Sequence, residues 1–132
     1  MCASAPFKHW IQIHGPQGEI VRIYALFDSG AMVCVMDEKV FEGLRNRLGR
    51  TSPPTKQLRL ANGLIMPSKA HWEGEIEVEG VKVRGSFEVF DSGGSWEFLL
   101  SKPMQAALGV VHDMRRDVVT LEAGGRSATI TN

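Results

Sequence analysis

Residues 20–36 read Ile-Val-Arg-Ile-Tyr-Ala-Leu-Phe-Asp-Ser-Gly-Ala-Met-Val-Cys-Val-Met, and our expectation of the fold begins with them. Apolar, strand-forming residues lie on both sides of Asp28-Ser29-Gly30, and we expect a second buried strand over residues 31–36. A carboxylate between buried strands is costly unless it is paired, hydrogen-bonded or protonated. The position of Asp28 therefore favours a functional explanation.

The tetrapeptide Phe-Asp-Ser-Gly occurs twice, at residues 27–30 and again at residues 90–93. Asp-Ser-Gly is common in turns, and the second copy continues into Gly94-Ser95, so we expect that copy to be a surface loop. Two carboxylates that share a proton can act on a water as base and acid. The chain has 132 residues, and half of them, 66, are too few for a lobe around each copy. A two-fold homodimer that brings Asp28 to Asp28 is simpler.

Alternation of apolar and polar residues at period two dominates the rest of the chain and predicts strands. The turn residues between alternating arms predict four hairpins, at Pro16-Gln17-Gly18, Asn62-Gly63, Glu79-Gly80 and Gly124-Gly125. One face of the third hairpin carries Glu73, Glu75, Glu77 and Glu79, which we interpret as a solvated strand face.

Two helices are expected. The first begins at Asp37-Glu38 and ends before Gly49, and the second has Ser101 as its N-cap and ends at Gly109. About ten short strands with two helices indicate one mainly β domain over residues 1–132, either a barrel or a closed sandwich.

The string Leu26-Phe27-Asp28-Ser29-Gly30-Ala31 resembles the active-site signature of retropepsins, the aspartic proteases of retroviruses and long-terminal-repeat retrotransposons. Residues 60–63 are similar to the tip of the family's flap, and residues 98–104 are similar to the segment that packs behind the active-site loop. Three elements in order make the resemblance fairly specific. It covers roughly residues 23–109, and the full string most resembles retropepsin-like domains of transposon-derived fungal polyproteins.

This resemblance implies a closed acid-protease barrel with a flap hairpin, one or two short helices and one lobe per chain. It implies an aspartic endopeptidase that works as a homodimer on a peptide or polyprotein, with water activated between two Asp28 carboxylates. Ala31 lacks a hydroxyl group, so we expect a mildly acidic pH optimum. The implied site comprises the catalytic Asp28, its loop residues Ser29, Gly30 and Ala31, the flap residues Leu60, Ala61, Asn62, Gly63 and Leu64, and the supporting residues Leu99, Leu100 and Ser101.

Ser101 departs from the resemblance, because retropepsins usually have glycine there. A hydroxymethyl group could crowd the loop that carries Asp28, or it could cap the following helix without harm. The alternative function is therefore a catalytically silent retropepsin fold that acts as a peptide-binding or dimerisation module.

Composition and spacing argue against other classes of function. The 15 basic and 15 acidic residues balance, so we expect no nucleic-acid partner. The four histidines lack ligand spacing and are expected to be surface or strand side chains, so we predict no metal and no cofactor. The longest apolar run, residues 31–36, is too short to cross a membrane. Two cysteines without a CxxC pair favour an intracellular, cytoplasmic location.

Overall fold

The computed structural model describes residues 6–54, 57–59 and 65–132, and these residues form eleven strands and two helices. The strand number is close to the ten expected. The elements are β1 (Lys8–His14), β2 (Ile20–Phe27), β3 (Val35–Asp37), α1 (Glu38–Leu48), β4 (Gln57–Arg59), β5 (Ile65–Pro67), β6 (His71–Val78), β7 (Val81–Phe90), β8 (Phe98–Leu100), α2 (Lys102–Ala107), β9 (Val111–Asp113), β10 (Val118–Ala123) and β11 (Arg126–Thr131).

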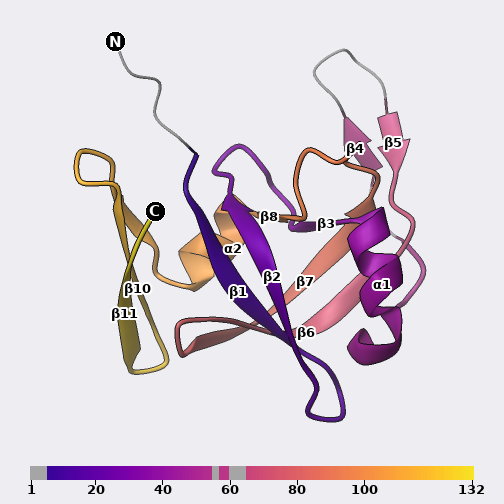
Figure 1. Ribbon diagram of the computed structural model, residues 1–132, viewed down its shortest axis with the longest axis horizontal. Coiled ribbons are helices and arrows are strands. Elements are labelled where there is room, and N and C mark those ends of the chain that lie inside the picture. Colours follow the sequence, from indigo (N-terminus) through magenta and orange to yellow (C-terminus); the bar gives the residue numbers. More distant parts are fainter. Residues whose placement is uncertain (1–5, 55–56, 60–64) are drawn as a thin grey trace.

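Six strands close into a barrel in the order β1-β2-β8-β3-β7-β6 (Figure 1). The hairpins β1–β2 and β6–β7 are antiparallel, as the turn residues predict. Strand β8 pairs parallel with β2 and antiparallel with β3, while β3 pairs parallel with β7. Two short strands from distant parts of the chain therefore complete the barrel between the two hairpins.

The turn between β6 and β7 shows why its residue types matter. Glu79 and Gly80 have φ angles of 47° and 84°, so both central residues adopt the left-handed conformation of a tight hairpin turn. The expected hairpin at Glu79-Gly80 is confirmed.

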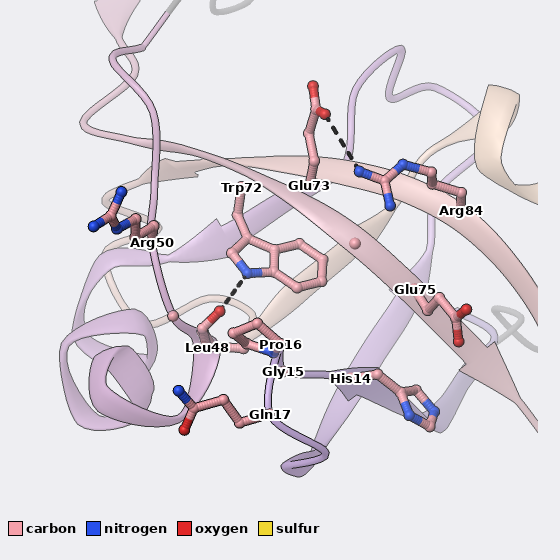
Figure 2. Close-up of a pocket in the computed structure, with 12 residues that line it drawn as sticks. His14, Gly15, Pro16, Gln17, Leu48, Arg50, Trp72, Glu73, Glu75 and Arg84 are labelled. Atoms are coloured by element: carbon pink, nitrogen blue, oxygen red, sulfur yellow. Dashed lines mark hydrogen bonds and ion pairs between the residues drawn. The ribbon is translucent and has the colours of Figure 1, made fainter.

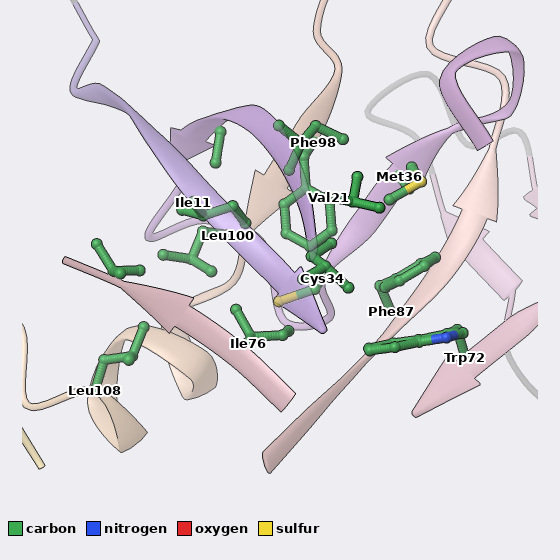
Figure 3. Packing of buried hydrophobic residues seen from close by; sticks show 14 of the residues in the cluster. Ile11, Val21, Cys34, Met36, Trp72, Ile76, Phe87, Phe98, Leu100 and Leu108 are labelled. Atoms are coloured by element: carbon green, nitrogen blue, oxygen red, sulfur yellow. The ribbon is translucent and has the colours of Figure 1, made fainter. Parts of the chain in front are cut away.

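The barrel interior is a continuous apolar cluster to which both hairpins contribute (Figure 3). Phe87 joins an aromatic group in this cluster: its ring stacks on Trp72 with centroids 5.0 Å apart and meets Phe98 edge-on at 5.7 Å. All three side chains are at most 2% exposed. Burying a side chain of this size contributes about 1.5–3 kcal/mol, so the alternation along the strands largely accounts for the core.

Helix α1 begins and ends where the sequence predicts. The Asp37 carboxylate accepts hydrogen bonds from the backbone N–H groups of Lys39 and Val40, at 3.1 and 3.4 Å, and from that of Ser92 at 2.9 Å. Burial raises the pKa of Asp37, but these hydrogen bonds outweigh burial and hold the pKa below its usual value. One side chain thus caps the helix and holds the loop before β8.

The C-terminal strands form a separate three-stranded sheet in the order β11-β10-β9, with the expected turn at Gly124-Gly125. Gly109, with φ of 64°, ends α2 and lies against β10: a Cβ atom there would sit 2.2 Å from the Glu122 carbonyl oxygen. Neither helix among the described residues is long and apolar enough to span a membrane.

The interpretation of the acidic stripe as a solvated strand face holds for Glu73, Glu75 and Glu79, which are exposed, whereas Glu77 is partly buried. Glu77 bonds to His14 of β1 at 2.7 Å, and Glu79 bonds to His9 at 3.0 Å. Both contacts join β1 to the β6–β7 hairpin, along the β1–β6 pairing that closes the barrel. The sequence of β6 does not show that β1 lies beside it.

Candidate functional site

Asp28 lies directly after the last residue of β2 and is half-buried, whereas Ser29 and Gly30 are exposed. Its Oδ1 accepts a hydrogen bond from the Gly30 backbone N–H at 2.8 Å. A Cβ atom on Gly30 would be 3.2 Å from that oxygen, which is a tight contact. Glycine therefore allows the loop to fold back under its own carboxylate while leaving part of the carboxylate accessible.

Neighbouring elements hold the Asp28 loop from behind. The Asp28 backbone N–H donates to the Leu100 carbonyl at 3.0 Å, which extends the parallel pairing of β2 with β8 beyond the last strand residue. The Lys102 N–H, in the first turn of α2, donates to the Ala31 carbonyl at 2.8 Å. Two elements far away in sequence thus brace the two ends of the Asp28-to-Ala31 loop.

The supporting residues lie where this bracing occurs. Leu99 pairs with Leu26 in the β2–β8 register and is half-buried, while Leu100 is fully buried in the core. Ser101 is 3% exposed and caps α2. The catalytic roles that the resemblance implies for these residues stay predictions.

The second tetrapeptide has the same local hydrogen bond as the first. The Gly93 N–H donates to Asp91 Oδ1 at 2.8 Å, the distance found in the first copy. Asp91 is exposed, and its loop joins β7 to β8, as expected of a surface loop. The local turn therefore depends on the tetrapeptide itself. The two aspartates differ in the elements that contact their loops, since β8 and α2 contact the loop of Asp28.

The prediction of a buried strand over residues 31–36 is wrong. The strand β3 spans only Val35–Asp37, and the chain before it forms turns and bends in which Met32 is 68% exposed. The physical reason is the bond from Lys102 N–H to Ala31, which holds residue 31 against the start of α2 and not against a strand. Asp28 therefore follows one strand and precedes a loop.

The Ser101 hydroxyl group faces α2 and the chain after the Asp28 loop. It accepts a hydrogen bond from the Met104 N–H at 3.2 Å and one from the Cys34 thiol at 3.4 Å. Burial raises the pKa of Cys34, and the hydrogen bonds with Ser101 offset only part of that rise. The sequence indicated the cap and the burial of Cys34, but no signal in it paired the two side chains.

The flap residues Leu60, Ala61, Asn62, Gly63 and Leu64 lie outside the described residues. The arms on either side, β4 and β5, pair antiparallel in the register Gln57 to Pro67, as a hairpin around Asn62-Gly63 requires. At the base of the arms, Ser52 and His71 exchange two backbone hydrogen bonds of 2.8 and 3.1 Å. Lys69 bonds to Glu38 at 2.8 Å and ties the base to α1.

Sequence analysis did not identify the pair of Glu88 and His71. These residues lie opposite each other on β7 and β6, and the His71 Nδ1 bonds to Glu88 Oε2 while its Nε2 bonds to Glu73 at 3.1 Å. Burial lowers the pKa of His71, but the two carboxylates outweigh burial and raise the pKa above its usual value. Glu88 is only 1% exposed, so it is a buried acid near the flap base.

A cavity of about 780 Å³ lies at the opposite end of β2 from Asp28, between the β1–β2 turn and the end of α1 (Figure 2). Its polar walls include an ion pair in which Arg84 Nη2 lies 3.8 Å from Glu73 Oε2. The Trp72 indole N–H, also in the wall, donates to the Leu48 carbonyl. It adjoins neither the Asp28 loop nor the flap arms.

Two smaller cavities are lined in part by residues that come shortly before or shortly after residues 28–31 in the sequence. One, of about 320 Å³, includes Leu26 and Trp96 in its walls, and the other, of about 220 Å³, includes Met32 and Val33. Within the described ranges, no three metal-ligating side chains come together. The chemistry available at this end of the barrel is therefore that of the partly exposed Asp28 side chain, which lines neither of these two cavities.

Comparison of the fold with solved structures identifies a similar protein. The crystal structure of the retroviral protease-like domain of Ddi1 from Leishmania major matches with a TM-score of 0.64 and 14% sequence identity, over 97% of this chain and 96% of that chain. No family model matches this sequence. No curated protein matches it either. The closed barrel and this neighbour show that the chain has a retropepsin-like fold of the mainly β class.

Proposed function

We propose that this protein is an aspartic endopeptidase that acts as a homodimer and hydrolyses peptide bonds with a water held between two Asp28 carboxylates. The main support is the placement of Asp28, a partly exposed carboxylate at the end of a barrel strand, in a loop braced by β8 and α2. The retropepsin-like fold adds to this support. The Asp-Ser-Gly-Ala string also favours the retroviral or retrotransposon type.

The need for a second chain follows from the number of suitable acids. The other Asp-Ser-Gly copy lies in an exposed loop that Asp37 holds through the Ser92 N–H, and it lacks the first copy's contacts with β8 and α2. The chain has one barrel among its described residues. An isologous two-fold axis would place identical Asp28 side chains face to face. Each carboxylate could then serve as acid or base while the other takes the opposite role.

The decisive variant is Asp28→Asn, which keeps an oxygen for the Gly30 N–H but cannot exchange the proton. We expect peptide cleavage to fall roughly 100-fold to 10,000-fold, the usual contribution of general acid–base catalysis. Asp91→Asn is a matched control, because it changes the same tetrapeptide with the same local hydrogen bond. Equal cleavage by the Asp28→Asn protein and the unmodified protein would refute the proposal.

A second measurement tests the dimer. Specific activity should rise with protein concentration until the dimer saturates, since each site needs two chains. Constant specific activity over a wide dilution range would contradict a two-chain site. Peptide binding without turnover by the unmodified chain would instead support the silent peptide-binding module.

A further inference from the structure

The cavity of about 220 Å³ lies on the β7 side of the Asp28 loop. Its walls come from three places in the chain: Met32, Val33 and Cys34 after the loop, Ser86, Phe87 and Glu88 on β7, and Ser101, Pro103 and Met104 at the start of α2. The volume is below the 300 Å³ or so at which drug-sized ligands begin to fit. It therefore suits a single side chain or another small group.

Among the described residues, Glu88 is the one carboxylate in the wall of this cavity, and its hydrogen bonding is incomplete. Its Oε2 bonds to His71, but its Oε1 is buried and has no hydrogen-bond partner among the described residues. A buried carboxylate oxygen without a donor is costly, because water is lost and nothing replaces it. A donor from outside this part of the chain would remove that cost.

Backbone contacts place Glu88 between the Asp28 loop and the flap base. Its N–H donates to the Cys34 carbonyl at 2.9 Å, which puts it alongside the segment that follows the loop. Its partner His71 is bridged to Ser52, directly before the segment that leads to β4. A peptide held between the loop and the hairpin would therefore pass this carboxylate.

We propose that Glu88 determines specificity, by accepting a lysine or arginine side chain of the peptide into this cavity. The inference rests on the proposed function, because the occupant is a substrate side chain. The ammonium or guanidinium group would donate to Oε1 in a charge-assisted hydrogen bond. Met32 and Met104 in the cavity wall would cover the aliphatic stem, as apolar surface commonly does for long basic side chains.

The test uses a set of octapeptides with an apolar central pair, in which each flanking position in turn carries lysine, arginine, norleucine or glutamate. Cleavage is measured with the unmodified protein, and binding is measured with the Asp28→Asn protein. At one position, the basic peptides should exceed the norleucine peptide about tenfold or more in both assays. Glutamate at that position should be the worst of the four.

The variant Glu88→Gln should remove this preference, because a neutral amide keeps the shape and loses the charge. Glu122→Gln is the control, since Glu122 is exposed on β10 and absent from the cavity wall. Circular dichroism and thermal unfolding establish whether Glu88→Gln folds. If Glu88→Gln does not fold, the proposal is tested by the ratio of lysine-peptide to norleucine-peptide cleavage and binding in the proteins that keep Glu88.

The outcomes separate the two proposals. Cleavage without any basic preference would overturn the role of Glu88 and leave the protease intact. Preferential binding of basic peptides without cleavage would uphold the role of the cavity and refute the protease. Neither binding nor cleavage of any peptide would overturn both.

Discussion

Replacing Ser101 tests whether its hydroxyl group supports or disturbs the Asp28 loop. The structure shows two bonds to the Ser101 oxygen, from the Met104 N–H at 3.2 Å and from the Cys34 thiol at 3.4 Å, in a residue that is 3% exposed. Helix α2 is only six residues long, so the N–H group that Ser101 satisfies is a large share of its unpaired donors. The hydroxyl group should therefore be stabilising.

The expected magnitude follows from the cap. Ser101→Ala should lower the free energy of unfolding by about 1–2 kcal/mol, at the upper end of the usual range because water cannot replace the buried oxygen. Ser101→Gly should also lower the free energy of unfolding, by about 1 kcal/mol, because it removes the same buried oxygen from the Met104 N–H and the Cys34 thiol. With a urea dependence of about 2 kcal/mol per molar, the alanine variant should shift the midpoint by about 0.5–1 M.

The assay is urea unfolding at one fixed protein concentration, since dimerisation would otherwise shift the midpoint. Ser127→Ala, at an exposed position on β11, is the matched control and should change the midpoint little. Cleavage rates of both Ser101 variants are measured in parallel. An increase in stability together with faster cleavage in Ser101→Gly would refute the capping argument and show that the hydroxyl group crowds the loop.

Three further predictions concern the rest of the chain. Gly109→Ala should cost at least about 2 kcal/mol in a thermal or urea melt, because its Cβ would meet the Glu122 carbonyl oxygen at 2.2 Å from a left-handed backbone conformation; no change would contradict the close contact. Cys34 should react with alkylating agents at neutral pH far more slowly in the folded than in the unfolded protein, since burial raises its pKa; equal rates would contradict this burial. Because the pKa of His71 is raised in the folded protein, its ion pairing stabilises the fold fully below the unfolded-state pKa of about 6.5, and this stabilisation is lost as pH rises through the folded-state pKa. The difference in unfolding free energy between the unmodified protein and His71→Gln should therefore shrink as pH rises through the folded-state pKa. A difference that does not change with pH would refute the assignment.

The hairpins, the helices and their caps could be predicted because each depends on residues close together in sequence. Asp37 bonds to N–H groups two and three residues ahead, and Glu79-Gly80 forms its turn within four residues. The error at residues 31–36 has the opposite cause. Those side chains are suited to a strand, but the N–H of Lys102, some 70 residues later, holds Ala31 in a loop.

Chemistry at the candidate site divides in the same way. The sequence predicts an Asp-Ser-Gly turn at both copies, and in each copy the glycine N–H donates to the aspartate Oδ1 at 2.8 Å. Which copy is braced by β8 and α2 is a tertiary matter that the strand composition around Asp28 only indicated. Glu88 could not have been identified, because its burial and its pairing with His71 arise where β6, β7 and β3 meet.

The mainly β class, the hairpin turns, the helix ends and the Asp28 motif could be predicted from the sequence, since period-two alternation and local hydrogen bonds act over a few residues. The tertiary structure alone decided that β8 lies between β2 and β3, that Ser101 meets Cys34, and that one oxygen of Glu88 is buried without a donor among the described residues. These features depend on closure of the barrel, which brings together segments that are far apart in the sequence. Local sequence patterns do not predict which of these segments pair.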